Sequence, residues 1–363
     1  MESFKLAHSA ASDWQTALED CLQQLGDIPP ETHLGFIYIT DHFTDDFANI
    51  SRYLQDKTAI THWAGTIGHA ICCTGQEYYD QAAVVMMLTD FPEDSFYLVQ
   101  SPEQLPQPPQ PGLQFAVVHG DPRNGQMPEL LEQFATKLGD AWLVGGLTSS
   151  EHYYYQLADT ITEGQLSGVV FSDQVAVISG LTQGCSPIGP VHTITECDGN
   201  YAVTLDKCPA LDVLKEDIGE ILARDLNRIS GYIFAGFPVR GSDTGDYMVR
   251  NLIGADHDNG VLAIGEYLHT GSSIMFCRRD GRTAVQDMER MLSHVKQRIT
   301  GPVKGGLYFS CMGRGQHMFG EVSKEMQLIQ QQLGDIPLVG FYANGEIAGH
   351  RLYGYTGVLS LFL

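Results

Sequence analysis

Residues 34–40, LGFIYIT, decide the fold of this chain. The run is apolar and rich in β-branched and aromatic residues, which is typical of a strand buried on both faces. A polar, amphipathic stretch follows through Leu54, and residues 60–66, ITHWAGT, form a second expected strand that ends at a glycine turn. Residues 82–88, AAVVMML, supply a third strand. This order of elements predicts an α/β fold.

The same order of elements returns twice. The second copy has strands at 113–119 and 168–172, a helix at 128–138 and a glycine turn at 143–147, and the third has strands at 306–310 and 357–362, a helix at 321–333 and a turn at 338–341. The separation from strand start to turn glycine is 30 residues (Gly35 to Gly65), 31 (Gln114 to Gly145) and 34 (Gly306 to Gly340). This spacing predicts internal duplication, with strand–helix–strand units that form mixed sheets under outer helices.

The chain is long enough for two domains. We expect a lead-in with a helix at 1–33, an N-terminal domain at 34–230 and a C-terminal domain at 231–363. Residues 101–111 hold five prolines and read as a stiff connector. Residues 183–189, QGCSPIG, read as a sharp turn with Cys185 facing a cleft between the domains.

Composition excludes several classes of protein. The net charge of −23 argues against nucleic-acid binding, which requires clustered Lys and Arg, and against anionic membrane surfaces. No apolar run approaches the roughly 20 residues of a membrane span, and the first residues do not resemble a secretory signal. The eight cysteines form no CxxC pair and are too sparse for a disulfide scaffold. We therefore expect a cytoplasmic protein with reduced thiols and no membrane insertion.

Seven short motifs, in order along the chain, resemble those of the FIST family, whose members pair an N-terminal and a C-terminal FIST domain. They are HWAGTIG at 62–68, TGQEYY at 74–79, QGCSPIG at 183–189, RD at 279–280, SCMGRG at 310–315, PLVGF at 337–341 and NGEI at 344–347. The resemblance implies a sensory protein that binds a small, amino-acid-like ligand. It also implies a separate output partner, such as a kinase or cyclase, because no signalling or F-box domain is fused to this sequence.

The loop after the third-copy strand is the first candidate ligand site. Gly313 and Gly315 free backbone N–H groups between Cys311 and a helix, and Arg314 can pair with a carboxylate or phosphate. Asn344 and Glu346 follow the third glycine turn, where Glu346 can accept from a ligand ammonium. Arg314 and Glu346 on one crevice would suit a zwitterion. The alternatives are a tight turn with a surface arginine, or a simple pair between Arg314 and Glu346.

Four further residues complete the predicted ligand set. Trp63 and Thr66 flank the first glycine turn, and Gln183 and Cys185 lie in the motif expected to line the cleft. Ligand sites in α/β sheets lie beyond the carboxyl ends of strands, often between domains. The predicted function is capture of a small polar or zwitterionic metabolite with no cofactor.

Two alternatives remain open. Haem requires only one axial histidine, and His42, His69, His119 and His317 lie near strand ends, so a haem-bound nitric oxide sensor is the second hypothesis. No HExxH motif or zinc spacing occurs among the 13 histidines. A hydrolase is the third. It is weak, because the Asp243-Thr244-Gly245 tripeptide has no second copy and Asp41 and His42 are adjacent in sequence. We expect no catalytic residues.

Overall fold

The computed structural model describes residues 3–106, 112–139, 141–223, 229–239 and 246–363. The chain forms two compact units, unit 1 from Met1–Thr182 and Val285–Leu363, and unit 2 from Gln183–Ala284. The C-terminal segment thus belongs to unit 1. The boundaries of the two units therefore differ from those of the predicted domains at 34–230 and 231–363. The predicted α/β class, with mixed sheets and outer helices, is confirmed. The Asp243-Thr244-Gly245 tripeptide and residues 107–111 of the proline-rich connector lie outside the described residues.

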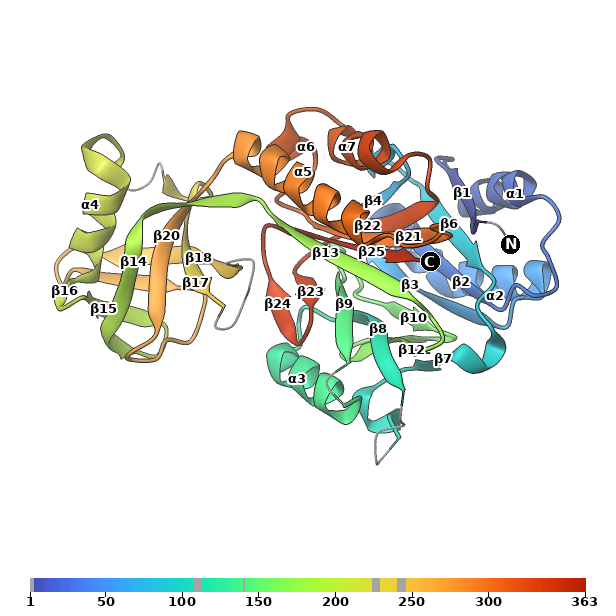
Figure 1. Ribbon diagram of the computed structural model, residues 1–363, viewed down its shortest axis with the longest axis horizontal. Coiled ribbons are helices and arrows are strands. Elements are labelled where there is room, and N and C mark those ends of the chain that lie inside the picture. The colour runs from blue at the N-terminus through green and yellow to red at the C-terminus, as the bar shows by residue number, and fades with distance from the viewer. Residues whose placement is uncertain (1–2, 107–111, 140, 224–228, 240–245) are drawn as a thin grey trace. The chain divides into compact units, whose positions relative to one another are not determined.

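Unit 1 contains the three expected copies, each with a pair of parallel strands joined through a helix (Figure 1). The parallel strands and helices are β2 (Leu34–Thr40), α2 (Phe47–Thr58) and β3 (His62–Gly68), then β8 (Leu113–Gly120), α3 (Met127–Lys137) and β9 (Trp142–Leu147), then β21 (Gly305–Cys311), α7 (Lys324–Leu333) and β22 (Leu338–Ala343). An antiparallel strand flanks each pair: β6 (Val84–Thr89), β12 (Leu166–Ser172) and β25 (Thr356–Phe362).

The three spaced glycines lie inside strands, so their prediction as turns was wrong. Gly65, Gly145 and Gly340 sit at the same register, opposite Ile37, Val118 and Tyr308 of the parallel neighbour. A Cβ added at any of them would lie on that neighbour's carbonyl oxygen, far inside the 3.0 Å that real Cβ atoms keep. Glycine is therefore needed for close approach of two strands and not for a bend.

The copies exchange hairpins. Each copy sends a short hairpin to the sheet of another copy, so that β4 pairs with β22, β10 with β3 and β23 with β9. The hairpins are β4 (Ala70–Cys73) with β5 (Gln76–Tyr79), β10 (Gln156–Ala158) with β11 (Thr160–Thr162), and β23 (Glu346–Ala348) with β24 (Arg351–Tyr353). The sheet of each copy also gains an edge strand from the segment that precedes the copy in sequence: β1 (Lys5–Ser9) joins β6, β7 (Phe96–Val99) joins β12, and β13 (Val177–Gln183) joins β25. The three six-stranded sheets are thereby interlocked.

The sheets meet at an aromatic centre. Tyr38 of β2 and His119 of β8 contact the rings of Phe309 and Phe341, and all four side chains are fully buried. Outer helices bury their apolar faces against the other side of each sheet. The outer helices are α2, α3, α7, α1 (Trp14–Leu25) and α5 (Gly281–Arg298). The shorter helical elements of unit 1 include α6 (Gln316–Phe319) and the 3₁₀ turns Asp41–Asp46, Glu93–Ser95 and Pro102–Gln104.

Unit 2 is a closed antiparallel barrel. Its strands follow one another around the barrel, and β15 closes it by pairing with β14. They are β14 (Cys185–Asp198), β20 (Ser273–Arg279), β17 (Ile233–Pro238), β18 (Tyr247–Asp256), β19 (Val261–Ile264) and β15 (Tyr201–Leu205), with β16 (Cys208–Pro209) beside β15 and helix α4 (Ala210–Ala223) packed on the core. The predicted turn at 183–189 was wrong, because Cys185 opens a long strand and Pro187 pairs with Cys277.

A histidine links three elements of the barrel unit. His192 Nδ1 lies 2.7 Å from Asp206 Oδ2, and its Nε2 lies 2.9 Å from Asp217 Oδ2 on α4. Both ring nitrogens can donate only when the ring is protonated. Burial alone would lower the pKa of His192, but the hydrogen bonds and charges of Asp206 and Asp217 outweigh it and raise the pKa.

This pair of bonds predicts a pH-dependent stability of unit 2. The stabilisation from a raised pKa is complete below the ordinary histidine pKa of about 6.5 and is lost as pH rises through the folded-state pKa. The melting temperature of His192→Gln should therefore fall below that of the unchanged chain at pH about 5.5, and the gap should narrow by pH about 9. Thermal unfolding across this range measures it. A gap that does not vary with pH would contradict this assignment.

Across the described ranges, no helix combines the length and apolar character that a bilayer-spanning helix requires.

Candidate ligand site

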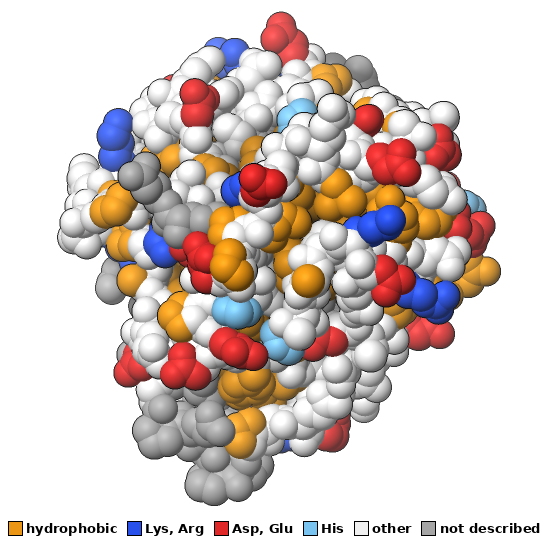
Figure 2. Space-filling model, turned by 90° about the vertical axis from the view of Figure 1, so that its right-hand side faces the viewer, with side chains coloured by type: hydrophobic (Ala, Val, Ile, Leu, Met, Phe, Trp, Pro, Cys, Tyr) orange, Lys and Arg blue, Asp and Glu red, His pale blue; other side chains and the backbone are white. Residues whose placement is uncertain are grey.

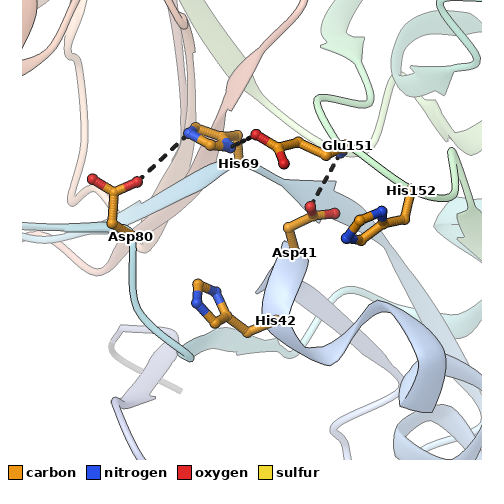
Figure 3. A pocket seen from close by; sticks show the side chains of 6 residues that line it. All are labelled: Asp41, His42, His69, Asp80, Glu151 and His152. Atoms are coloured by element: carbon orange, nitrogen blue, oxygen red, sulfur yellow. Dashed lines mark hydrogen bonds and ion pairs between the residues drawn. The ribbon is translucent and has the colours of Figure 1, made fainter.

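Six ionisable side chains surround a hollow of about 290 Å³ in unit 1, which we call the strand-end pocket (Figure 3). Asp41 and His42 directly follow β2, His69 follows β3, and Asp80 follows the exchanged hairpin strand β5. The parallel strands β2 and β3 end at the same edge, which brings the first three together. The last two lining residues, Glu151 and His152, lie in the loop between β9 and β10 of the second copy.

The loop that carries Glu151 is fastened to the first copy. Asp41 accepts a hydrogen bond from the Glu151 backbone N at 3.1 Å and another from the Ser150 hydroxyl. Thr66 of β3 donates to the Tyr155 carbonyl at 2.8 Å and bonds the Thr148 hydroxyl at 2.7 Å. Both ends of this loop are thus held in place. The pocket is built by the exchanged pairing of β10 with β3.

His69 lies between two carboxylates. Its Nε2 is 3.7 Å from Asp80 Oδ1, and its Nδ1 is 3.9 Å from Glu151 Oε1 (Figure 3). The side chains of Asp80 and Glu151 are 77% and 69% exposed, so these long contacts contribute little to stability. The backbone of His69 is fixed, since its N–H donates to Ser149 Oγ at 2.9 Å. The side chains therefore remain available to a ligand on a fixed frame.

The lining favours a ligand that donates hydrogen bonds. It holds three carboxylates and three imidazoles, and none of these six described residues is Lys or Arg. Acidic side chains are spread over the face shown in Figure 2, as the net charge of −23 leads one to expect. Histidine side chains lie near the middle of the same face. A field of this sign attracts cations and repels anions.

Arg314 lies away from solvent and does not line the strand-end pocket. Its side chain is fully buried, and its Nε and Nη2 lie 2.8 Å from Glu325 Oε1. Glu325 also accepts from Tyr308 at 2.6 Å and from the Gly315 N–H at 3.0 Å. The sequence interpretation missed Glu325, although an acidic residue on the buried face of an amphipathic helix was a signal. The helix after the loop, α6, has four residues, too short for the helix N-terminal site that was predicted.

Glu346 is buried near this cluster but does not pair with Arg314 as the simple alternative held. Its Oε2 accepts from the Thr356 N–H at 3.1 Å and hydroxyl at 2.8 Å. Burial raises the pKa of Glu346 to about 8. Glu346 Oε1 and Arg314 Nη1 are among the buried described atoms that have no hydrogen-bond partner. Asn344 is exposed and donates its N–H to the Leu147 carbonyl at 3.0 Å.

The other predicted ligand residues are structural neighbours of these elements. Cys311 Sγ accepts from the Gly313 N–H at 3.4 Å, and Trp63 is fully buried in the core beside Gly35. Gln183 donates to the Tyr247 carbonyl at 3.1 Å, and the Cys185 carbonyl accepts from Tyr247, both in unit 2. None of the ten predicted ligand residues lines the strand-end pocket. Their contact with a ligand stays a prediction.

The four histidines proposed as haem ligands do not offer a place that fits haem. His119 is fully buried among aromatic rings, and burial lowers its pKa to about 3. His317 is exposed on α6. His42 and His69 line the pocket, but its lining is wholly ionisable, whereas a haem macrocycle needs an apolar slot. The described residues also include no cluster of three or more His, Cys, Asp or Glu able to hold a metal ion.

Comparison with known proteins agrees with the resemblance read from the motifs. The FIST N domain model matches residues 33–207, and the FIST C domain model matches residues 210–349. Uncharacterised proteins of Mycobacterium tuberculosis (strain H37Rv) and Mycobacterium bovis are 35% identical over 250 residues and 31% identical over 247 residues. Each match covers 64% of both chains, so this chain spans just under two thirds of the length of these relatives. FIST domains are associated with small-ligand sensing and signal transduction, and this chain belongs to the FIST family.

Proposed function

We propose that this protein is a sensor that binds a small polar ligand in the strand-end pocket and does not transform it. One observation carries the proposal: ionisable side chains from two copies face one hollow on fixed backbone. Convergent polar groups in a concave site are the usual mark of a small-molecule site. The proposed setting is the cytoplasm, in keeping with a sequence whose eight cysteines form no CxxC pair and are too sparse for a disulfide scaffold.

Ligand binding would change the loop that joins β9 to β10. A ligand held between His69 or Asp80 and Glu151 or His152 links the first copy to this loop. The same loop carries Tyr153 and Tyr155, whose rings stack at 5.2 Å, and Tyr153 is 44% exposed. A shift of this exposed aromatic surface is a change that a separate signalling protein, such as a kinase or cyclase, can detect.

We further propose that the buried cluster around Arg314 holds the pocket residue Asp80 in position. Tyr79 immediately precedes Asp80, and its ring lies 5.2 Å from that of Tyr342. Tyr342 in turn donates to Glu325 Oε2 at 3.4 Å, and Glu325 pairs with Arg314. Loss of this support would displace Asp80 indirectly. In this proposal Arg314 helps to position Asp80 and does not contact the ligand.

A ligand screen tests the proposal. Thermal-shift screening of amino acids, amines, nucleotides and haem against the full chain should reveal a stabilising small polar compound, since a ligand at 100 times its Kd adds about 2.7 kcal/mol. Calorimetry should then show binding weakened about tenfold or more by His69→Ala, because the central side chain of the pocket is lost.

The matched control is His317→Ala, which removes an exposed histidine on α6 outside the pocket. It should leave the affinity unchanged. The compound should also be recovered unaltered after incubation. Affinity that is insensitive to His69→Ala would remove the pocket from the proposal, and turnover of the compound would replace the sensor with an enzyme.

A further inference from the structure

In the second copy, the positively charged side chain of Arg123 lies where the parallel strands end. Arg123 donates from Nε to Asp121 Oδ1 at 3.0 Å and from Nη2 to Asp121 Oδ2 at 2.6 Å. Nη2 also reaches Glu163 Oε2 at 3.1 Å, and the guanidinium lies 4.8 Å from the centre of the Tyr154 ring. Two carboxylates and an aromatic face thus surround one planar cation, an arrangement suited to a guanidinium.

The same place in the first copy is the strand-end pocket. Ile37 and Val118 occupy equal register positions, opposite Gly65 and Gly145, so that His42 is the counterpart of Arg123, five residues further along each chain segment. Asp80 and Gly164 follow the equivalent exchanged hairpins, and both have positive φ, 51° and 73°. The strand ends of the two copies are therefore built on one backbone plan.

The carboxylates come from equivalent elements in both copies. In the second copy, Asp121 follows β8 and Glu163 follows β11. In the first copy, Asp41 follows β2 and Asp80 follows β5, and Glu151 adds a third carboxylate. The first copy thus has acidic residues at the same strand ends, each one residue later in register than in the second copy, and at position 42 it has a histidine in place of the arginine. The hollow of the first copy is lined by His42, the residue that stands at the register position of Arg123.

We propose that the ligand of the strand-end pocket is a small molecule with a guanidinium group, which occupies the place that Arg123 fills in the second copy. This inference rests on the proposed binding function. Asp80 and Glu151 both line the hollow, and each carboxylate can accept from a planar fork of N–H donors. A compact metal ion is disfavoured, because the described carboxylates and imidazoles form no cluster able to hold one.

Calorimetry on the full chain tests the chemical class. Agmatine and arginine should bind, and citrulline, which replaces the guanidinium by a neutral urea group of the same shape, should bind at least about tenfold more weakly. Asp80→Asn and Glu151→Gln should each weaken agmatine binding about fivefold to tenfold. Asn tolerates the positive φ at position 80, so that variant should keep its backbone. The control is Glu163→Gln, the same loss of charge outside the pocket, which should leave the affinity unchanged.

A gain-of-occupant variant provides a second test. His42→Arg should place a guanidinium on the pocket carboxylates, as Arg123 does in the second copy, and should abolish agmatine binding. Equal affinity for citrulline and arginine, or agmatine binding that survives His42→Arg, would overturn the inference. If only a neutral or anionic compound binds in a manner sensitive to His69→Ala, the guanidinium assignment fails and the binding function stands. If no compound binds in that manner, both fail.

Discussion

Replacing Gly340 with alanine should destabilise unit 1 by about 3 kcal/mol or more, one of the two largest effects that we expect. Gly340 lies in β22, directly opposite Tyr308 of the parallel strand β21. A methyl group there would fall on the Tyr308 carbonyl oxygen, which belongs to backbone and cannot rotate away. The two strands would have to part, and they form the middle of a six-stranded sheet.

Urea unfolding followed by circular dichroism measures this loss. The matched control is Gly301→Ala, because a Cβ at Gly301 meets open space and its φ is not in the left-handed region. It should change the free energy of unfolding by no more than about 0.5 kcal/mol. Equal stability of the two variants would show that β21 and β22 do not approach as closely as described.

Replacing Glu325 with alanine should remove about 3–5 kcal/mol from the free energy of unfolding. Arg314 and Glu325 are both fully buried, and Glu325 is the carboxylate that pairs with the Arg314 guanidinium. Its removal leaves an arginine charge in the interior without its ion-pair partner, and it also strips an acceptor from the Tyr308 hydroxyl. Burying an unpaired charge is among the most destabilising single changes.

Two comparison variants separate charge from volume. Glu325→Gln keeps the size of the side chain, so most of the loss should remain if charge is the cause. Asp212→Asn breaks the exposed pair between Asp212 and Lys215 and should cost at most about 1 kcal/mol. Chemical unfolding of all three proteins measures the difference. If Glu325→Gln is as stable as the unchanged chain, the buried ion pair is not what holds this cluster.

The strands of unit 1 could be predicted because their signal is local. A run such as residues 34–40 is almost wholly apolar, which is what burial on both faces requires, and it is buried at every position. The glycines could not be assigned in this way. Gly65 and Gly340 resemble turn residues in the local sequence, and the reason for their lack of a side chain is a carbonyl on a strand about 30 residues away in sequence. Only the parallel pairing reveals it.

Part of the strand-end pocket could be predicted from the sequence. His42 and His69 follow strands of the first copy and were named, as haem candidates, on that ground alone. Glu151 and His152 could not be found, because they reach the pocket only through the pairing of β10 with β3 from another copy. The burial of Arg314 could not be predicted, because here the local sequence signal is misleading. A glycine-rich loop with an arginine suggests an open anion site, and nothing local shows that Glu325, eleven residues later, encloses it.

The exchange of hairpins also has a consequence for synthesis on the ribosome. β4 and β9 acquire their partners β22 and β23 only when residues 338–348 have emerged, long after residues 70–147 were made. Until then the nascent chain carries two unpaired sheet edges, which can capture other unfolded chains. We expect newly made protein to depend on chaperones until its final residues are released, and chains that stop before residue 338 to aggregate instead of forming a smaller folded protein.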